Sequence, residues 1–238
     1  MSPHGVSGYP FHTQRVLRVH ERLVRRKRFR ERGKILRVIN HVARIDQERC
    51  NACSTCVKVC PVEAIELKQQ EKRTFAAMDA QKFLGCTICI SRCPVGAIAR
   101  EQRPVPLKVG VDPRDVAEEA VAEICEAAHM YPDQVVCFCR RIQAKEVAAA
   151  ILKGAETPEE ISRKTGVRTG CGVLCITGVL RLLKAAGVEL NRAPGYQWYG
   201  ADISIWNISE EVQKKFPTYF LSEDRQAIDN LFPGGKHR

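Results

Sequence analysis

The sequence has few aromatic residues, 6% of 238, although 45% of its residues are hydrophobic. Small modules that bind metal would explain this balance, because coordination energy replaces part of an aromatic core. No apolar run reaches the roughly 18 residues that a membrane span needs. The basic stretch near the amino terminus is not followed by the apolar segment of a secretory signal. We therefore expect a cytoplasmic protein, with one large domain or two to three small ones.

The sequence also lacks the patterns that indicate an enzyme. No glycine-rich nucleotide loop follows a strand pattern, and no nucleophile–base constellation is visible. The six histidines show no paired spacing, and we expect His41 to be structural. We therefore expect no catalytic residue and no separate site for a single metal ion.

Instead the chain has twelve cysteines, and eleven of them form three ordered groups. A disulfide framework is the alternative, but the clustering is tight, a secretory signal is lacking, and the chain is longer than most disulfide-stapled domains. In a reducing compartment such spacings indicate metal binding. The first group reads Cys50-x2-Cys53-x2-Cys56-x3-Cys60-Pro61, and the second reads Cys86-x2-Cys89-x3-Cys93-Pro94.

These two groups are an internal duplication, since Val and Ala-Ile recur after each Cys-Pro pair. From about residue 43 to 100 the chain resembles the two-cluster bacterial ferredoxins, in which the last cysteine of each run binds the other cluster. The resemblance implies short strands near Ala43–Ile45 and Arg73–Ala77, with a helical turn after each first loop. It implies a 4Fe-4S cluster on Cys50, Cys53, Cys56 and Cys93, and a second cluster on Cys60, Cys86 and Cys89.

The second site departs from the family, because Phe83 stands where its fourth cysteine would be. Three outcomes are open. The site holds a 3Fe-4S cluster, or it holds a 4Fe-4S cluster with a substitute ligand, or it is empty. We favour an occupied site because three cysteines keep the correct spacing. Cys125, on a predicted amphipathic helix over 115–130, is expected to be a buried thiol, and the hypothesis that it replaces the missing ligand stays open.

The third group consists of Cys137-Phe138-Cys139 and Cys171-x3-Cys175. The residues between the two pairs predict a helix over 144–152 and another that begins at Thr157-Pro158-Glu159-Glu160, which combines an N-cap, proline at N1 and glutamate at N3. A third helix is predicted over 173–186. The segment 134–188 resembles the bacterioferritin-associated ferredoxins, although that family commonly has two residues within its second pair. The resemblance implies a 2Fe-2S cluster on Cys137, Cys139, Cys171 and Cys175, and structural zinc is the alternative.

The two ends of the chain differ from these modules in composition. Between Arg15 and Arg44 there are twelve Lys or Arg residues, within a net charge of +11. Such an arm suits an acidic protein partner, and nucleic acid, an anionic membrane and a plain solvated helix are the alternatives. After residue 190, seven of the fifteen aromatic residues lie within 25 residues, and we expect this extension to dock on a partner or wrap back over the chain. They are Tyr196, Trp198, Tyr199, Trp206, Phe216, Tyr219 and Phe220.

We therefore predict an α+β protein, in which a small duplicated ferredoxin-like module precedes a small all-α 2Fe-2S module and both termini are extended. The expected segments are a basic docking arm (1–42), a two-cluster domain (43–103), a linker with a bridging helix (104–133), a 2Fe-2S domain (134–190) and a docking extension (191–238).

The predicted function is an electron-transfer subunit, not itself an enzyme. It would relay single electrons between a catalytic flavoprotein or metalloenzyme subunit and another carrier, such as a soluble ferredoxin or other acidic carrier. One alternative is an enzyme subunit that binds substrate at the incomplete cluster. Another is a redox- or iron-responsive regulator that binds nucleic acid, whose binding would depend on salt.

Overall fold

A computed structural model describes residues 36–189, 205 and 208–232 of the chain, and these residues combine helices and strands in an α+β arrangement. The amino-terminal basic stretch up to residue 35 lies outside the described residues, as do Tyr196, Trp198, Tyr199 and Trp206. Two modules contain the cysteine groups. We call them the strand module (residues 37–109) and the helical module (residues 113–189).

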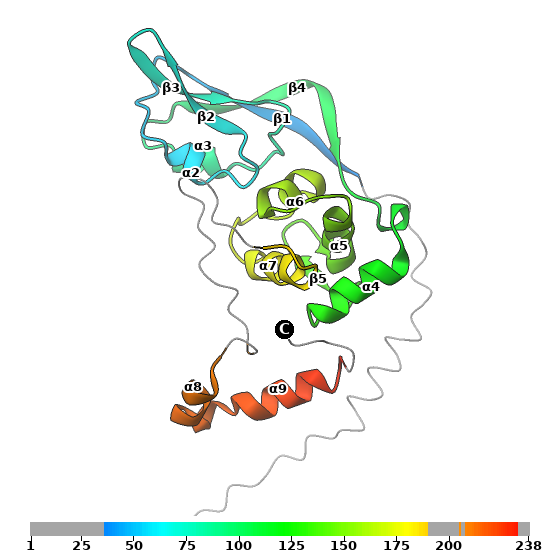
Figure 1. Ribbon diagram of the computed structural model, residues 1–238. Helices are drawn as coiled ribbons and strands as arrows, with labels where there is room; N and C mark the ends of the chain where they lie inside the picture. The colour runs from blue at the N-terminus through cyan, green and yellow to red at the C-terminus, as the bar shows by residue number, and fades with distance from the viewer. Residues whose placement is uncertain (1–35, 190–204, 206–207, 233–238) are drawn as a thin grey trace, which may run out of the picture. The chain divides into compact units, whose positions relative to one another are not determined.

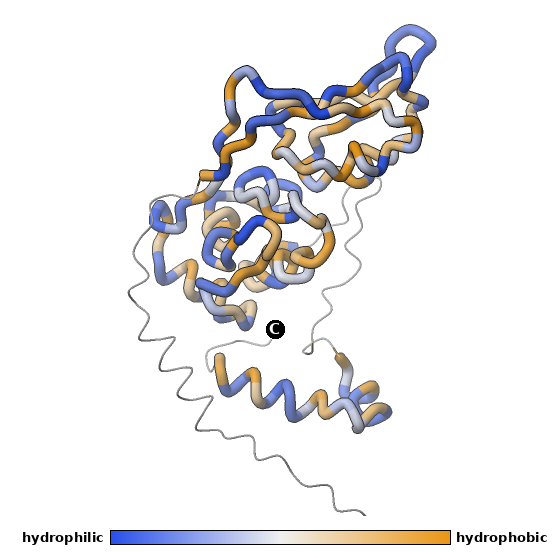
Figure 2. Tube along the Cα trace, turned by 180° about the vertical axis from the view of Figure 1, so that it is seen from behind, coloured by the Kyte–Doolittle hydropathy of each residue, from blue (hydrophilic) through white to orange (hydrophobic). Residues whose placement is uncertain are grey.

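The strand module is built on two antiparallel strand pairs (Figure 1). Strand β1 (Arg37–Ile45) pairs with β4 (Ile98–Val109), from Arg37 opposite Val109 to Ile45 opposite Ile98. Strand β2 (Ile65–Gln70) forms a hairpin with β3 (Arg73–Met78), and its turn is hydrophilic (Figure 2). The predicted short strands are thus found in β1 and β3. The β1–β4 pair extends beyond the domain limits of 43 and 103 that the sequence led us to expect. The sequence does not reveal the extension, because the outer residues of the two strands contain no long apolar run.

One short helix follows the first loop of each of these two cysteine groups, as predicted. These helices are α2 (Thr55–Lys58) and α3 (Ile88–Arg92), and they pack against each other. The core of the module lies between these helices and the strands. It includes Val62, Ile65, Phe83, Leu84 and Ile98, together with Cys56, Cys60 and Cys89. Three of the cysteines that should bind metal are therefore themselves part of the core.

The helical module begins with η1 (Pro113–Asp115) and α4 (Glu118–Ala127), where the sequence predicts the bridging helix. It continues with α5 (Ala144–Leu152), α6 (Pro158–Thr165) and α7 (Ile176–Ala185). The sequence led us to expect an all-α module, but this one also contains strands. Strands β5 (Val135–Cys137) and β6 (Ile142–Gln143) pair around the Cys137–Cys139 turn. They are too short to produce a recognisable alternating pattern.

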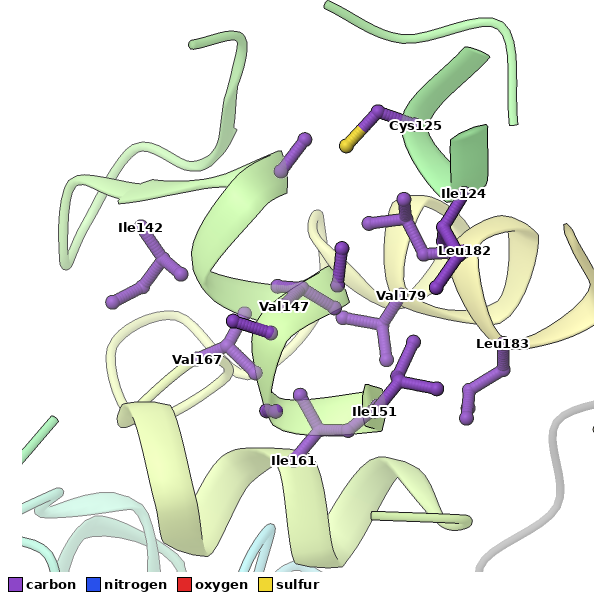
Figure 3. Close-up of a cluster of buried hydrophobic side chains, with 14 of the residues drawn as sticks. Ile124, Cys125, Ile142, Val147, Ile151, Ile161, Val167, Val179, Leu182 and Leu183 are labelled. Carbon is purple, nitrogen blue, oxygen red and sulfur yellow. The ribbon is translucent and has the colours of Figure 1, made fainter. Parts of the chain in front are cut away.

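A dense core joins the four main helices of this module (Figure 3). Helix α5 is buried on almost every side, because alanine at three successive positions allows its neighbours to approach closely. The predicted capping box starts α6: Thr157 Oγ1 accepts the Glu160 N–H at 3.2 Å, and the Glu160 carboxylate accepts the Thr157 N–H at 3.3 Å. Such a box satisfies two amides that a helix leaves free. The module therefore has a complete apolar core besides its cysteines.

The described part of the carboxy-terminal extension contains α8 (Glu210–Lys215), η3 (Pro217–Tyr219) and α9 (Leu221–Asp229). The side chains of Phe216, Tyr219 and Phe220 are exposed. Phe232 contacts Tyr131 with their ring centroids 4.9 Å apart. Within the described residues, no helix has both the length and the apolar character that crossing a membrane requires.

Candidate metal centres

The first cysteine set surrounds one pocket in the strand module. Cys50, Cys53, Cys56 and Cys93 all line it, together with Ala76 and Ile98. Backbone amides point at the sulfur atoms: the Ala76 N–H donates to Cys50 Sγ at 3.4 Å, and the Ala97 N–H donates to Cys93 Sγ at 3.3 Å. Such amides stabilise a negatively charged cluster. The pocket thus combines three cysteines of the first run with the last cysteine of the second, which is the set implied by the ferredoxin resemblance.

The second set is more deeply buried. Burial raises the pKa of Cys86 to about 11 and that of Cys89 to about 12, and the neighbouring thiols of this set add to both shifts. Burial also raises the pKa of Cys60, whose sulfur accepts the Ala64 N–H at 3.2 Å. Each thiol must lose its proton to bind iron, so cluster assembly here releases protons into solution. The structure brings these three cysteines together.

Phe83 occupies the position of the missing fourth ligand and belongs to the apolar core, with 2% of its surface exposed. Its backbone carbonyl accepts a hydrogen bond from Arg103 Nη2 at 2.9 Å. The same guanidinium donates to the carbonyl of His41 at 3.0 Å and to that of Ala80. Arg103 therefore ties the backbone before and at Phe83 to strand β1.

The third set lies where the β5–β6 turn meets the amino-terminal end of α7. The Cys175 thiol donates a hydrogen bond to Cys137, which lowers the pKa of Cys137 to about 6 and raises the pKa of Cys175. A hydrogen bond also joins the side chains of Cys139 and Cys171. The backbone amides of Val173 and Leu174 point at Cys171 and lower its pKa. Those two residues serve the site, so α7 begins at Ile176 and not at Val173, where the sequence predicts it.

The loop between Arg168 and Gly172 sets the geometry of this site. The backbone amide of Arg168 donates to both Cys137 and Cys175. Its side chain forms an ion pair with Glu159 at 2.8 Å, and the two side chains are only 5% and 2% exposed. Sequence reasoning missed both residues, because a buried pair nine residues apart has no local pattern. Removing one partner of such a pair leaves a buried charge and is strongly destabilising.

Cys125 lies in the core of the helical module, fully buried beside Ile124 and near Leu182 (Figure 3). Phe83, in contrast, belongs to the core of the strand module. Burial raises the pKa of Cys125 to about 11, with Asp133 contributing. The position of Cys125 supports a structural role for this thiol. It gives no support to the hypothesis that Cys125 replaces the missing ligand.

Replacing Cys125 with serine should therefore lower the stability of the fold and leave the clusters in place. Burying the hydroxyl in an apolar core costs about 1–3 kcal/mol in the free energy of unfolding. Iron and sulfide content per folded chain, measured beside thermal unfolding, distinguishes a buried structural thiol from a cluster ligand. A Cys125→Ser protein that loses iron from the second site would show that Cys125 is a ligand after all.

The three cysteine sets define an iron–sulfur protein. None of the twelve cysteines, all of which lie in the described residues, forms a disulfide. Nor do three or more His, Cys, Asp or Glu side chains of the described residues gather closely enough for one metal ion.

Comparison with known proteins agrees with this class. Residues 19–97 match the family of the 4Fe-4S dicluster domain, and residues 135–185 match the BFD-like [2Fe-2S] binding domain. The chain thus carries 4Fe-4S and 2Fe-2S cluster domains in succession. Over 33 residues it is 54% identical to one subunit of an ion-translocating oxidoreductase complex from Methanosarcina acetivorans. That match covers 14% of this chain and 12% of the relative.

Proposed function

We propose that this chain is an electron-transfer subunit of an oxidoreductase complex. It relays single electrons between a catalytic subunit, which is a flavoprotein or metalloenzyme, and another carrier. The observation that carries this proposal is the gathering of eleven cysteines into three sites. The two matched iron–sulfur domains support it, as does the likeness to a subunit of an oxidoreductase complex.

In this proposal the strand module is a ferredoxin-like module with two clusters. Cys50, Cys53, Cys56 and Cys93 hold a 4Fe-4S cluster, Cys60, Cys86 and Cys89 hold the second cluster, and Cys137, Cys139, Cys171 and Cys175 hold the 2Fe-2S cluster. The clusters supply the one-electron chemistry. The chain's own contribution is to bind them, to point backbone amides at the sulfur atoms and to exclude water, and these set the potentials.

The burial of the second site favours a carrier over an enzyme that binds substrate at the incomplete cluster. A substrate would need to reach an iron that lacks a protein ligand. Phe83 fills that position within the core, and Cys60, Cys86 and Cys89 are buried. The missing ligand therefore changes the properties of the cluster and does not open it to a substrate.

Two features support docking within a larger assembly. The exposed aromatic side chains of Phe216, Tyr219 and Phe220 are of the kind that anchors protein interfaces. The net charge of +11 favours encounters with an acidic carrier, such as a soluble ferredoxin. Twelve cysteines without a disulfide suit the reducing cytoplasm, where we place the protein.

Anaerobically purified full-length protein tests this function by iron, sulfide and zinc analysis beside EPR. We expect about nine or ten irons per chain and reversible one-electron reduction of both cluster types. Zinc in place of the 2Fe-2S cluster, or clusters that dithionite does not reduce, would contradict the proposal. Failure to bind DNA at any salt concentration is expected in the same preparation, and salt-dependent binding would favour the regulator instead.

A further inference from the structure

The ligand loops of the second site and the 2Fe-2S site are in direct contact. Ile88 lies between Cys86 and Cys89, and Gly172 directly follows Cys171. A Cβ atom built on Gly172 would be 3.0 Å from Ile88 Cδ1, which is closer than ordinary van der Waals contact. Gly172 also has a φ of +78°, so both the backbone conformation and the close approach of Ile88 favour glycine at this position. The ligand loops of the two sites thus touch at Ile88 and Gly172.

Arg140, the residue after Cys139, reaches the same contact. Its guanidinium donates to the Thr169 carbonyl at 2.7 Å, which holds it beside the 2Fe-2S loop. Its positive charge also lies close enough to Cys86 to interact with that residue electrostatically. One side chain thus interacts with both cluster sites.

Two side-chain bridges hold the modules together at this contact. Arg37, on β1, donates to the Glu146 carboxylate of α5 at 3.1 Å and to the Arg140 carbonyl at 3.4 Å. The Arg37 and Glu146 side chains are 14% and 5% exposed. Arg163, on α6, bonds the Glu63 carboxylate at 2.8 Å and the Val62 carbonyl at 3.2 Å. Because the first pair is shielded from water, it resists salt better than a surface pair.

The second site also adjoins the first. Cys56, a first-site cysteine, and Cys89 belong to the same buried core cluster. The helices that carry these two residues, α2 and α3, pack together. Cys53, in contrast, is exposed at the first site, and Cys139 and Cys171 are exposed at the 2Fe-2S site. The buried second site thus adjoins both other cysteine sites, and each of those two sites has a cysteine accessible to a partner.

We infer that the cluster beside Phe83 is the middle station of the relay, with the first 4Fe-4S cluster and the 2Fe-2S cluster as its two ends. This inference rests on the proposed function. Each step moves one electron: one end cluster is oxidised as the middle cluster is reduced, and the middle cluster is reoxidised as the other end is reduced. No bond or proton is transferred. The partner subunit and the carrier supply and remove the electron at the ends.

Magnetic interaction between reduced clusters tests this order in the full-length protein. Reduced 2Fe-2S, 3Fe-4S and 4Fe-4S clusters all carry unpaired electrons, so a close neighbour speeds the relaxation of the 2Fe-2S signal. We expect fast relaxation in the unmodified protein and in Cys53→Ala, and its loss in Cys86→Ala. Slow relaxation in the unmodified protein would overturn the inference. So would a loss of the fast relaxation in Cys53→Ala but not in Cys86→Ala. If the 2Fe-2S cluster is absent or cannot be reduced, the proposed function fails instead.

A second set of variants leaves every ligand in place, so it tests the contact between the second site and the 2Fe-2S site even where Cys86→Ala does not fold. Replacing Arg37 and Arg163 with alanine removes the donor side chain of each bridge between the modules. We expect this double variant to keep its full iron content, to lose the fast relaxation and to slow electron transfer from the 2Fe-2S cluster. Lys145→Gln is the matched control, because it breaks an ion pair to Asp133 within the helical module. An unchanged double variant would contradict the role of the bridges in positioning the clusters.

Discussion

Replacing Gly170 with alanine should abolish the 2Fe-2S centre and leave the other clusters in place. A Cβ atom at this position would lie 2.3 Å from Cys139 Cβ and 3.2 Å from its Sγ. No rotamer relieves this clash, because the backbone of Cys139 fixes the position of its Cβ atom and rotation about χ1 does not move it. The ligand loop must therefore move, and ligands that move by a fraction of a bond length no longer fit a cluster. We expect a loss of about two irons per chain, together with the 2Fe-2S EPR signal.

Gly187→Ala provides the control in the same module. Gly187 has a φ of +77° but nothing lies within 4 Å of its Cβ position. Alanine there costs about 1 kcal/mol of backbone strain and touches no ligand. Its 2Fe-2S signal should match that of the unmodified protein. A Gly170→Ala protein with a full 2Fe-2S content would show that the loop binds the cluster in another conformation.

Replacing Phe83 with cysteine should convert the second site into a complete 4Fe-4S site. Position 83 has the spacing of the missing ligand, and Arg103 holds its backbone in place. We propose that the unmodified site, with only three cysteines gathered, holds a 3Fe-4S cluster. The variant should then gain about one iron per chain and lose the EPR signal of the oxidised 3Fe-4S cluster. Its potential should change by more than that of any other single variant considered, since cluster type is a main determinant of potential.

The loss of the aromatic ring must be separated from the gain of the thiolate. Truncating a buried phenylalanine to alanine costs about 3–5 kcal/mol, so Phe83→Cys will unfold more easily. Phe83→Ser leaves a cavity of similar size but supplies no thiolate, and it should keep the 3Fe-4S signal. If the unmodified protein already contains a 4Fe-4S cluster at this site, Phe83→Cys will leave the iron content unchanged, and the nuclearity that we propose is wrong.

The cysteine sets could be predicted from the sequence because iron–sulfur ligands come from short loops. Three cysteines within seven residues can reach one site only if the chain curls around it. The return of Cys93 to the first pocket was implied by the resemblance to the two-cluster ferredoxins, in which the last cysteine of each run binds the other cluster. The helix over 144–152 and the box at Thr157 were predicted because helix periodicity and caps are local signals.

The contacts that assemble these parts could not be predicted in this way. Arg37 and Glu146 are 109 residues apart, and neither stands in a motif. Glu63, which bonds Arg163, lies within the repeated flank, where its counterpart is Gly96. Comparing the two halves of the repeat therefore shows that position 63 differs from its counterpart. This difference does not indicate that Glu63 bonds Arg163. The same holds for Arg168, whose role depends on the buried carboxylate of Glu159.

The two cores give the modules different dependence on the supply of iron. Three cysteines of the strand module belong to its buried core, so without clusters this core contains thiols in place of a large rigid group. The helical module encloses Val147, Ile161, Val179, Leu182 and Leu183 around α5, and only Cys137 and Cys175 of its metal-binding cysteines reach that interior. During synthesis the helical module should therefore reach its native shape before iron arrives, whereas the strand module must wait for the cell to load it. A cell short of iron would accumulate chains that are half folded, with the 2Fe-2S site ready and the middle of the relay missing.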